Sequence, residues 1–372
     1  MDFELSAEQQ ALGEAVRQFI TREYDLAARK AILATPHGFS ESVWESLAGL
    51  GVLGVGLPEE QGGLGGAVEV MVVMEQIGAG LVLEPFLSSI VLSGGLVARH
   101  GSPAHRSRIL PALIQGRRRL ALAHFEPGAR YAADQVDTRV RRRNEGWVLS
   151  GRKSAVLDGA TADTFIVTAR EEPGGAVTPF VLERTRSGLE ARSYRTHDGR
   201  NAADLELRDV PVLSEDVLGE AVGLPAIEEA LEHALAALCA EAVGIMEALV
   251  QATREYVKTR VQFGRPIGEF QVLQHRIADM FIMTTQARSM SYLATGRCDC
   301  ADATRRRHDI AAAKAFIGKA ARYVGQQAVQ LHGGMGLSAE LAVSHYFKRL
   351  TAISATFGDT DHQLGVVAES ML

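Results

Sequence analysis

The sequence predicts an α+β fold in three parts: an N-terminal all-helical domain, a middle β domain and a C-terminal helical bundle. Apolar residues recur at helical spacing in the first and last parts, whereas the middle part consists of short β-prone runs interrupted by Gly, Pro and Asp. A length of 372 residues also exceeds what one ordinary core organises. We therefore expect domains at residues 1–118, 119–223 and 224–372.

The N-terminal domain is expected to begin with a helix at Ser6. Ser6 and Gln9 form a Ser-x-x-Gln capping box, and Val16 and Phe19 then fall on one helical face. Further helices are expected at residues 41–50, 68–77, 86–97 and 107–113, with a Gly-rich turn at residues 58–66.

The middle and C-terminal parts differ in the period of their apolar residues. No helical pattern separates the β-prone runs, which favours a barrel or sandwich over β-α-β units. After Pro225, apolar residues recur every three or four positions to Leu249, and two more long helical patterns cover residues 271–293 and 308–331. This spacing is typical of an antiparallel four-helix bundle.

Composition and charge exclude several classes of function. The formal net charge is −6 and 47% of residues are apolar, so nucleic acid is not expected as a partner. Arginine triplets at 117–119, 141–143 and 305–307 are expected on solvated faces, with contact to an anion or a CoA phosphate as the alternative. The most apolar stretch, residues 78–98, contains Glu84 and Pro85, which favours a buried helical hairpin over a membrane span.

Cysteine usage and the N-terminus indicate the compartment. Cys239, Cys298 and Cys300 lack the spacing of a disulfide framework or a zinc site, so no metal is expected. The residues after Met1 lack the basic and apolar regions of an export signal. A cytoplasmic protein is therefore expected.

Two motifs at the ends of long helices carry side chains suited to a cofactor. Arg260, Phe263 and Gln271 lie in a Gly-containing turn, where a guanidinium can bind a phosphate and an amide can recognise a heteroaromatic edge. The glycines of Gln330-Leu-His-Gly-Gly-Met-Gly-Leu337 would allow close approach of a ligand phosphate or ring. Taken separately, the first motif is also explained by a loop between bundle helices and the second by a helix C-cap.

Taken together, in this order and spacing, the two motifs resemble those of the acyl-CoA dehydrogenase family. The resemblance covers essentially the whole chain, including the loop Pro58-Glu-Glu-Gln-Gly-Gly-Leu-Gly65 and the segment Phe347-Lys-Arg-Leu350. Within the family, residues 347–350 and 357–363 are most similar to the small subunit of pimeloyl-CoA dehydrogenase.

The resemblance implies an FAD enzyme that oxidises an acyl-CoA to its trans-2-enoyl-CoA and passes electrons to an electron-transferring flavoprotein. A carboxylate would remove the proton alpha to the thioester while the beta hydride passes to the flavin. By the same resemblance, most of the cofactor-binding residues would contact FAD held mainly by a neighbouring subunit. The implied cofactor-binding residues are Arg260, Phe263, Gln271, Gln330, Gly333, Gly334 and Thr360.

The sequence departs from the family at both known positions of the catalytic base. The family's Tyr-Glu-Gly-Thr appears as Phe357-Gly-Asp-Thr360, so Gly358 replaces the glutamate, and the alternative position falls on Ala234. The family's flavin loop appears as Glu126-Pro-Gly-Ala-Arg-Tyr-Ala-Ala-Asp134, and its Trp-Ile-Thr appears as Ala155-Val-Leu157. The cross-subunit residues are therefore retained, whereas the base, an aromatic wall and a hydroxyl are lost.

Three side chains near the vacant positions are candidate substitutes for the base. Asp359 is either a working base or, more simply, a helix cap or FAD-edge residue. Glu241 lies roughly 11 Å beyond Ala234 along a helix axis, and an ordinary bundle-face glutamate is the simpler interpretation. The sequence alone identifies no residue that would orient His233 as a base, which favours a structural histidine.

These observations favour the base-lacking subunit of a heteromeric FAD-dependent acyl-CoA dehydrogenase. We expect an α2β2 assembly in which a homologous large subunit supplies the glutamate. One alternative is a self-sufficient homotetramer with Asp359 as the base. Another is a non-catalytic acyl-CoA or nucleic-acid binding protein on the same fold. Dicarboxylyl, bulky cyclic and steroid side-chain thioesters all stay open as substrates.

Overall fold

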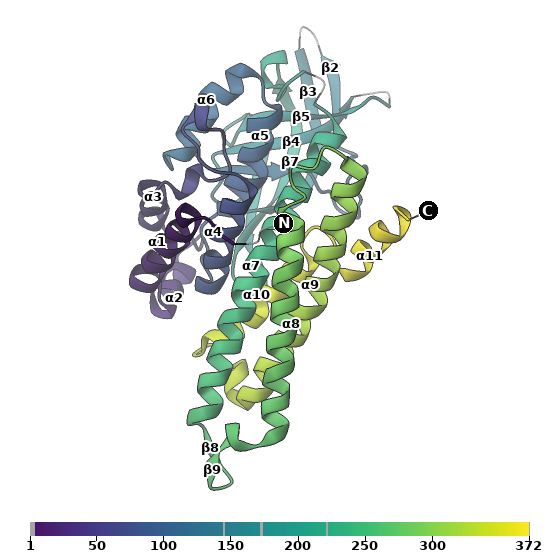
Figure 1. Cartoon of the computed structure of the whole chain (residues 1–372). Helices are drawn as coiled ribbons and strands as arrows, with labels where there is room; N and C mark the ends of the chain where they lie inside the picture. The colour runs from purple at the N-terminus through teal and green to yellow at the C-terminus, as the bar shows by residue number, and fades with distance from the viewer. Residues whose placement is uncertain (1–3, 144–145, 172–173, 221, 372) are drawn as a thin grey trace. The chain divides into compact units, whose positions relative to one another are not determined.

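The computed structural model describes residues 4–143, 146–171, 174–220 and 222–371 (Figure 1). The chain divides into two compact units. Unit 1 comprises Met1–Lys30, Ala67–Val82 and Leu235–Leu372, and unit 2 comprises Ala31–Gly66 and Leu83–Ala234. Each unit is described by itself below.

The N-terminal region is helical, as its sequence predicts. The Ser6 hydroxyl accepts a hydrogen bond from the Gln9 amide at 3.2 Å, and the Gln9 side chain accepts one from the Ser6 amide at 2.9 Å, which completes the expected capping box. The helices are α1 (Ala7–Glu23), α2 (Leu26–Ala34), α3 (Glu41–Gly49), α4 (Ala67–Gly80), α5 (Gly95–His100) and α6 (Pro103–Ile114), with short turns η1 (Val52–Gly54) and η2 (Glu59–Gln61).

Three of these helical segments differ from the prediction. The predicted helix at 86–97 is a fully buried π-helix, η3 (Phe86–Gly94), followed by α5. Helix α6 begins earlier than predicted because the Ser102 hydroxyl caps it and Pro103 occupies its first turn. Helix α2 was not predicted, although Asp25 is its capping signal, since its carboxylate accepts a hydrogen bond from the Ala28 amide at 2.7 Å.

The middle region of unit 2 is a seven-stranded sheet, which confirms the predicted β domain. The strands lie in the order β1-β4-β2-β3-β7-β6, with β5 also paired to β4. Strand β4 runs parallel to β1 and β2 and the other pairs are antiparallel, so the sheet is mixed. Buried residues such as Leu149, Phe165 and Leu205 form its core. The strands are β1 (Leu120–Ala123), β2 (Arg139–Arg143), β3 (Gly146–Leu157), β4 (Thr164–Glu171), β5 (Val177–Glu183), β6 (Leu189–Arg195) and β7 (Asn201–Val212), with the turn η4 (Ser214–Asp216) after them.

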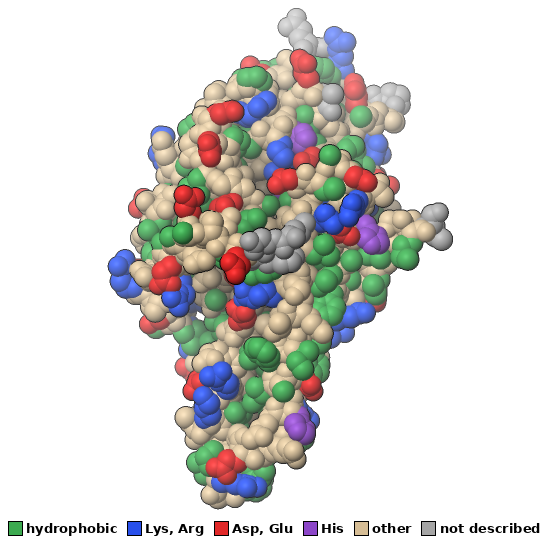
Figure 2. Space-filling model, in the orientation of Figure 1, with side chains coloured by type: hydrophobic (Ala, Val, Ile, Leu, Met, Phe, Trp, Pro, Cys, Tyr) green, Lys and Arg blue, Asp and Glu red, His purple; other side chains and the backbone are tan. Residues whose placement is uncertain are grey.

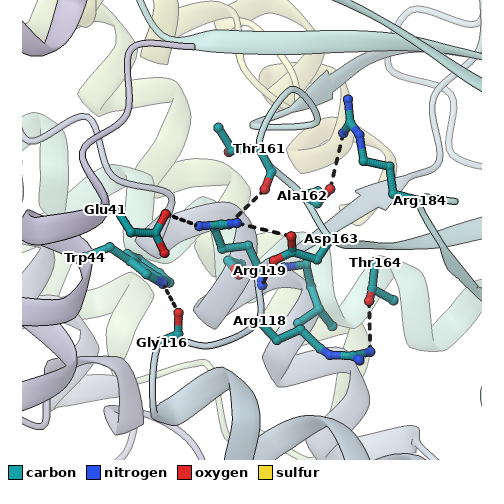
Figure 3. A network of polar contacts seen from close by, with 12 residues as sticks. Glu41, Trp44, Gly116, Arg118, Arg119, Thr161, Ala162, Asp163, Thr164 and Arg184 are labelled. Carbon is teal, nitrogen blue, oxygen red and sulfur yellow. Dashed lines mark hydrogen bonds and ion pairs between the residues drawn. The ribbon is translucent and has the colours of Figure 1, made fainter. Parts of the chain in front are cut away.

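The first arginine triplet ties the start of this sheet to its surroundings in unit 2 (Figure 3). Arg119 bonds the Glu41 carboxylate at 2.8 Å, the Asp163 carboxylate at 3.1 Å and the Thr161 carbonyl at 2.8 Å. Arg118 bonds the Glu183 carboxylate at 2.8 Å. In the second triplet, Arg141 and Arg143 both pair with Asp209. These arginines therefore bind carboxylates of the chain itself.

The C-terminal region is a helical bundle, as predicted. The elements are α7 (Leu224–Thr259), β8 (Val261–Gln262), β9 (Arg265–Pro266), η5 (Ile267–Glu269), α8 (Gln271–Thr295), α9 (Ala303–His332), η6 (Gly333–Leu337), α10 (Ala342–Ala355) and α11 (Thr360–Glu369). Helix α9 begins before the predicted position because Asp302 caps it, accepting a hydrogen bond from the Arg305 amide at 3.1 Å.

Helices α4 and α7 of unit 1 pack with their backbones in contact. A side chain at Gly78 would collide with the Glu241 carbonyl oxygen, and one at Gly244 would collide with the Glu75 carbonyl oxygen. Helix α7 is long and apolar enough to cross a membrane by length and composition, but 78% of its most apolar window is buried inside the protein. Burial to that extent is typical of a core helix.

Ion pairs join α7 to the helices around it. Arg349 of α10 makes a bidentate pair with Glu241 at 2.6 and 2.7 Å, and both side chains are buried. Arg288 of α8 pairs with Glu75 of α4 at 3.4 Å and also with Glu247 of α7. Glu241 thus serves a buried salt bridge, which does not support a role as the base.

Candidate functional site

The two cofactor motifs lie at the same end of the bundle in unit 1 (Figure 1). The β8–β9 hairpin follows α7, and η6 follows α9. Tyr256 of α7 stacks on His332 of α9 with ring centroids 4.3 Å apart, and the Tyr256 hydroxyl donates to the His332 carbonyl at 3.4 Å. We call residues 260–271 and 330–337 the bundle tip.

Phe263 stands at the turn of the hairpin in the bundle tip. Phe263 and Gly264 have φ of 54° and 79° and connect two antiparallel two-residue strands, the pattern of a type I′ turn. This conformation is strained for an aromatic residue, and strain of this kind occurs mostly at functional positions. The Phe263 side chain is 91% exposed and contacts the edge of Phe270, with centroids 6.1 Å apart. The hairpin therefore presents an aromatic ring to its surroundings.

The polar side chains of the bundle tip are also exposed. Arg260, Gln271 and Gln330 all lie on the surface. The Arg260 backbone is fixed because its amide donates to the Tyr256 carbonyl and its carbonyl accepts from the Ile267 amide, each at 2.9 Å. Arg265, the second arginine of this motif, is not among the cofactor-binding residues that the resemblance implies, and its guanidinium lies 4.4 Å above the Phe270 ring. The sequence signal that could have marked Arg265 as a site residue is its position in the motif, between Gly264 and Pro266.

The glycines of the bundle tip differ in what they allow. A Cβ at Gly336 would lie 2.6 Å from the Val329 carbonyl oxygen, so packing within the chain requires that glycine. Gly333 has φ of 60°, but a Cβ on Gly333 or Gly334 would meet nothing within 4 Å. The backbone at these two residues is therefore open to a ligand phosphate or ring.

The residues at the vacant base position form the turn between α10 and α11. Phe357 and Gly358 have φ of 56° and 115°, and the Gln363 side-chain amide donates to the Phe357 carbonyl at 2.9 Å. Asp359 is the N-cap of α11, because its carboxylate accepts a hydrogen bond from the His362 amide at 2.9 Å. This geometry gives Asp359 a capping role rather than supporting it as a base.

A buried lysine lies beneath this turn. Lys314 of α9 is 1% exposed, and its ammonium donates to the Gly358 carbonyl at 3.0 Å and to the Ser354 carbonyl at 3.4 Å. Burial lowers the pKa of Lys314 to about 8, although Cys239 and Asp359 oppose that shift. Burial also raises the pKa of the Cys239 thiol to about 12, so the thiol stays protonated and unreactive.

An apolar cluster of unit 1 supports the turn at Gly358. Leu235, which follows Ala234, is part of a buried apolar cluster with Ile310 and Ala313, and Phe357 packs against that cluster. The half-buried Thr360 begins α11, and its hydroxyl oxygen lies 2.7 Å from where a Cβ on Gly318 would stand. The structure therefore brings the other six implied cofactor residues together and places Thr360 apart from them. His233 is half-buried on α7.

The altered flavin loop in unit 2 is held by a buried charge pair. The Glu126 carboxylate accepts from the Asp137 and Thr138 amides at 2.7 and 2.9 Å and pairs with Lys153 at 2.6 Å. Burial alone would raise the pKa of Glu126, but Lys153 brings it below its ordinary value. Ala155 and Leu157 supply neither a ring nor a hydroxyl, so these residues fit a flavin less well than the bundle tip does.

The bundle tip and the altered flavin loop at residues 126–134 thus differ in how well their residues fit FAD. The bundle tip offers an exposed ring, a guanidinium, amides and open glycine backbone, which match the chemistry of FAD. Among the residues that the structure describes, no group of three His, Cys, Asp or Glu side chains is arranged to hold a metal ion.

Comparison with known proteins identifies the class. The models of the N-terminal, middle and C-terminal domains of acyl-CoA dehydrogenase match residues 6–117, 121–210 and 221–372. Mitochondrial isovaleryl-CoA dehydrogenase of Oryza sativa subsp. japonica is 30% identical over 340 residues, covering 88% of this chain and 82% of its own. The chain belongs to the acyl-CoA dehydrogenase family, whose members are oxidoreductases with FAD as cofactor.

Solved structures agree with this assignment. The ChsE4-ChsE5 complex from Mycobacterium tuberculosis contains a chain that is 26% identical with a TM-score of 0.90, covering 100% of this chain and 99% of that one. The FAD complex of PigA is 25% identical with a TM-score of 0.90, covering 100% and 99% of the two chains. The predicted family is therefore confirmed.

Proposed function

We propose that this chain is the base-lacking subunit of a heteromeric FAD-dependent acyl-CoA dehydrogenase, similar in role to the small subunit of pimeloyl-CoA dehydrogenase. One observation carries the proposal: Arg260, Phe263, Gln271 and Gln330 are exposed at the bundle tip, while Gly358 and Ala234 leave both base positions without a carboxylate. A homologous large subunit would supply the glutamate in an α2β2 assembly. The substrate would be an acyl-CoA, and an electron-transferring flavoprotein would take the electrons.

The bundle tip would complete a flavin site held by the partner subunit. Arg260 would bind a phosphate oxygen pair, Gln271 would bind a heteroaromatic edge, and Phe263 would pack on a ring. Gln330 and the open backbone of Gly333 and Gly334 would contact the pyrophosphate and adenosine side. When bound, FAD accepts the beta hydride of the acyl group. The partner's carboxylate, rather than a residue of this chain, would remove the alpha proton.

The apolar surface of α8 supports a partner. One face of α8 is buried against the bundle, but Val272, Phe281 and Ile282 outside that face are exposed, with Phe281 62% exposed. Phe281 also lines a groove of about 630 Å³, together with Val250, Val257, Ile277 and Ala278. Figure 2 shows hydrophobic side chains on the surface over the lower part of α7 and α8. Exposed apolar area of this kind is typical of protein interfaces.

The first experiment compares the chain alone with the chain co-expressed with a homologous subunit that carries the Tyr-Glu-Gly-Thr glutamate. Visible spectra are recorded before and after anaerobic addition of a medium-length acyl-CoA. We expect no bleaching of a flavin band by the chain alone and bleaching by the complex. Bleaching by the chain alone would show a complete active site and would contradict the proposal.

The contribution of the bundle tip is tested within the same complex. Arg260→Ala and Phe263→Ala are expected to lower the FAD content after gel filtration. Leu213→Ala removes an exposed apolar side chain outside the bundle tip and serves as the matched control. Equal FAD content in all three variants would contradict the proposed role of the tip.

A further inference from the structure

The turn between α10 and α11 is filled by side chains of the chain itself. A Cβ placed on Gly358 would lie 2.5 Å from Cδ2 of His362 and closer still to Nε2 of Gln363. The φ of 115° at Gly358 is also one that residues with a side chain rarely adopt. Position 358 therefore lacks both the backbone conformation and the space for a side chain.

Gln363, the nearer of the two neighbours that fill this space, is itself fixed. Gln363 is buried, and its amide donates to the Phe357 carbonyl at 2.9 Å, so displacing it would leave buried polar groups without hydrogen bonds. Lys314 holds the Gly358 carbonyl at 3.0 Å from below, and Asp359 caps the first turn of α11. The turn is thus held from α9, from α11 and by its own backbone.

We infer that Lys314 and Gln363 hold the 356–359 turn in a closed form that excludes a side chain at position 358. The inference rests on the proposed function and deepens it. If it holds, returning the glutamate alone does not rebuild a base, because the turn has no room for the glutamate. The chain is then a specialised partner rather than an enzyme one substitution away from activity.

The test uses the full-length chain and thermal unfolding. Gly358→Ala and Gly358→Glu are expected to lower the melting temperature by roughly 2–10 °C, because each combines backbone strain with a steric conflict. Gly334→Ala is the matched control, since nothing lies within 4 Å of its added Cβ. A Gly358→Ala chain as stable as the Gly334→Ala chain would overturn the inference.

A double-mutant cycle tests the part played by Gln363. Removing the Gln363 amide clears the space next to position 358, so Gly358→Ala should lower the melting temperature less in a Gln363→Ala background than in the unmodified chain. Additive losses would contradict the steric conflict. Lys314→Met is expected to speed amide hydrogen exchange at residues 356–360 by about tenfold or more relative to residues 333–337. Unchanged exchange at the turn would remove Lys314 from its positioning role.

Activity gives a separate outcome. We expect the Gly358→Glu chain, expressed alone and supplied with FAD, to leave the flavin band unchanged on addition of acyl-CoA. Bleaching by this variant but not by the unmodified chain would overturn the closed turn while supporting the base-lacking function. Bleaching by the unmodified chain would instead overturn the proposed function, and the melting temperatures would still decide the inference.

Discussion

The bundle tip and the 356–359 turn belong to the same helical unit and have opposite characters. Lys314 and His332, which mark the two regions on α9, are about 27 Å apart along its axis. At the tip, the Phe263 ring is exposed, and nothing in the chain lies within 4 Å of a Cβ placed on Gly333 or Gly334. At the turn, the Gln363 amide and the His362 imidazole fill the space next to Gly358, and Lys314 binds its carbonyl. The same unit thus keeps an outward surface in one region and packs its own side chains into another.

From this difference we expect the largest loss of unfolding free energy in the isolated chain when a buried side chain of the bundle, away from the tip, is removed. Glu241→Ala removes the carboxylate that faces the buried Arg349, and breaking such a pair from one side costs about 3–5 kcal/mol of unfolding free energy. Urea unfolding of the isolated chain measures the loss. Glu255→Ala is the control, because Glu255 lies on the same helix near the tip in an exposed pair with Lys258. Equal losses for the two variants would refute the contrast.

The folding stability of the isolated chain is expected to depend on pH through Glu75, with an effect of intermediate size. Burial raises the pKa of Glu75 to about 7, Arg288 opposes the shift, and Glu247 adds to it. Because the folded pKa lies above the unfolded value of 4.5, the stabilisation is complete below pH 4.5 and is lost as the pH rises to about 7.

Glu75→Gln removes this dependence. The unfolding free energy of the unmodified chain should fall relative to that of the variant by about 3 kcal/mol between pH 4.5 and pH 7.5. Denaturant unfolding at a series of pH values measures the difference between the two chains. Parallel pH profiles would show that Glu75 titrates at its ordinary pKa in the folded chain.

The smallest effect on the isolated chain is expected at the bundle tip. Gly334→Ala adds a methyl group into open space and should change the unfolding free energy by no more than about 0.5 kcal/mol. In the proposed assembly the same variant should reduce FAD retention, because the added methyl group would cover the open backbone that the ligand contacts. Loss of stability without loss of FAD would reverse the comparison.

Most of the fold was predictable from the sequence because its apolar residues recur at regular helical spacing. The long helices follow from apolar residues at helical spacing, and the capping box at Ser6 and Gln9 marks the first helix. The sequence missed features that depend on partners far along the chain. The Glu241 and Arg349 side chains pair across 108 residues, and the parallel pairing of β4 with β1 has no local signature.

The candidate site was predictable from its residues but not in its geometry. Spacing and resemblance pointed to Arg260, Phe263 and Gln330, and the structure places them in one region of the bundle. A Phe-Gly pair does not indicate a type I′ turn as an Asn-Gly pair does, so the position of the ring was not foreseen. The role of Lys314 was missed because a buried lysine that bonds backbone carbonyls leaves no pattern in sequence.

In the assembly proposed above, the hairpin turn would also affect how tightly the subunits bind each other. Folding already bears the conformational cost of placing Phe263 at φ 54°, so this backbone loses little further freedom when a second subunit arrives. Preorganisation of this kind lowers the entropy loss of association and acts mainly by slowing dissociation. The lifetime of the proposed assembly would therefore depend in part on the backbone dihedral angles of Phe263 and Gly264, in addition to the area that the subunits bury.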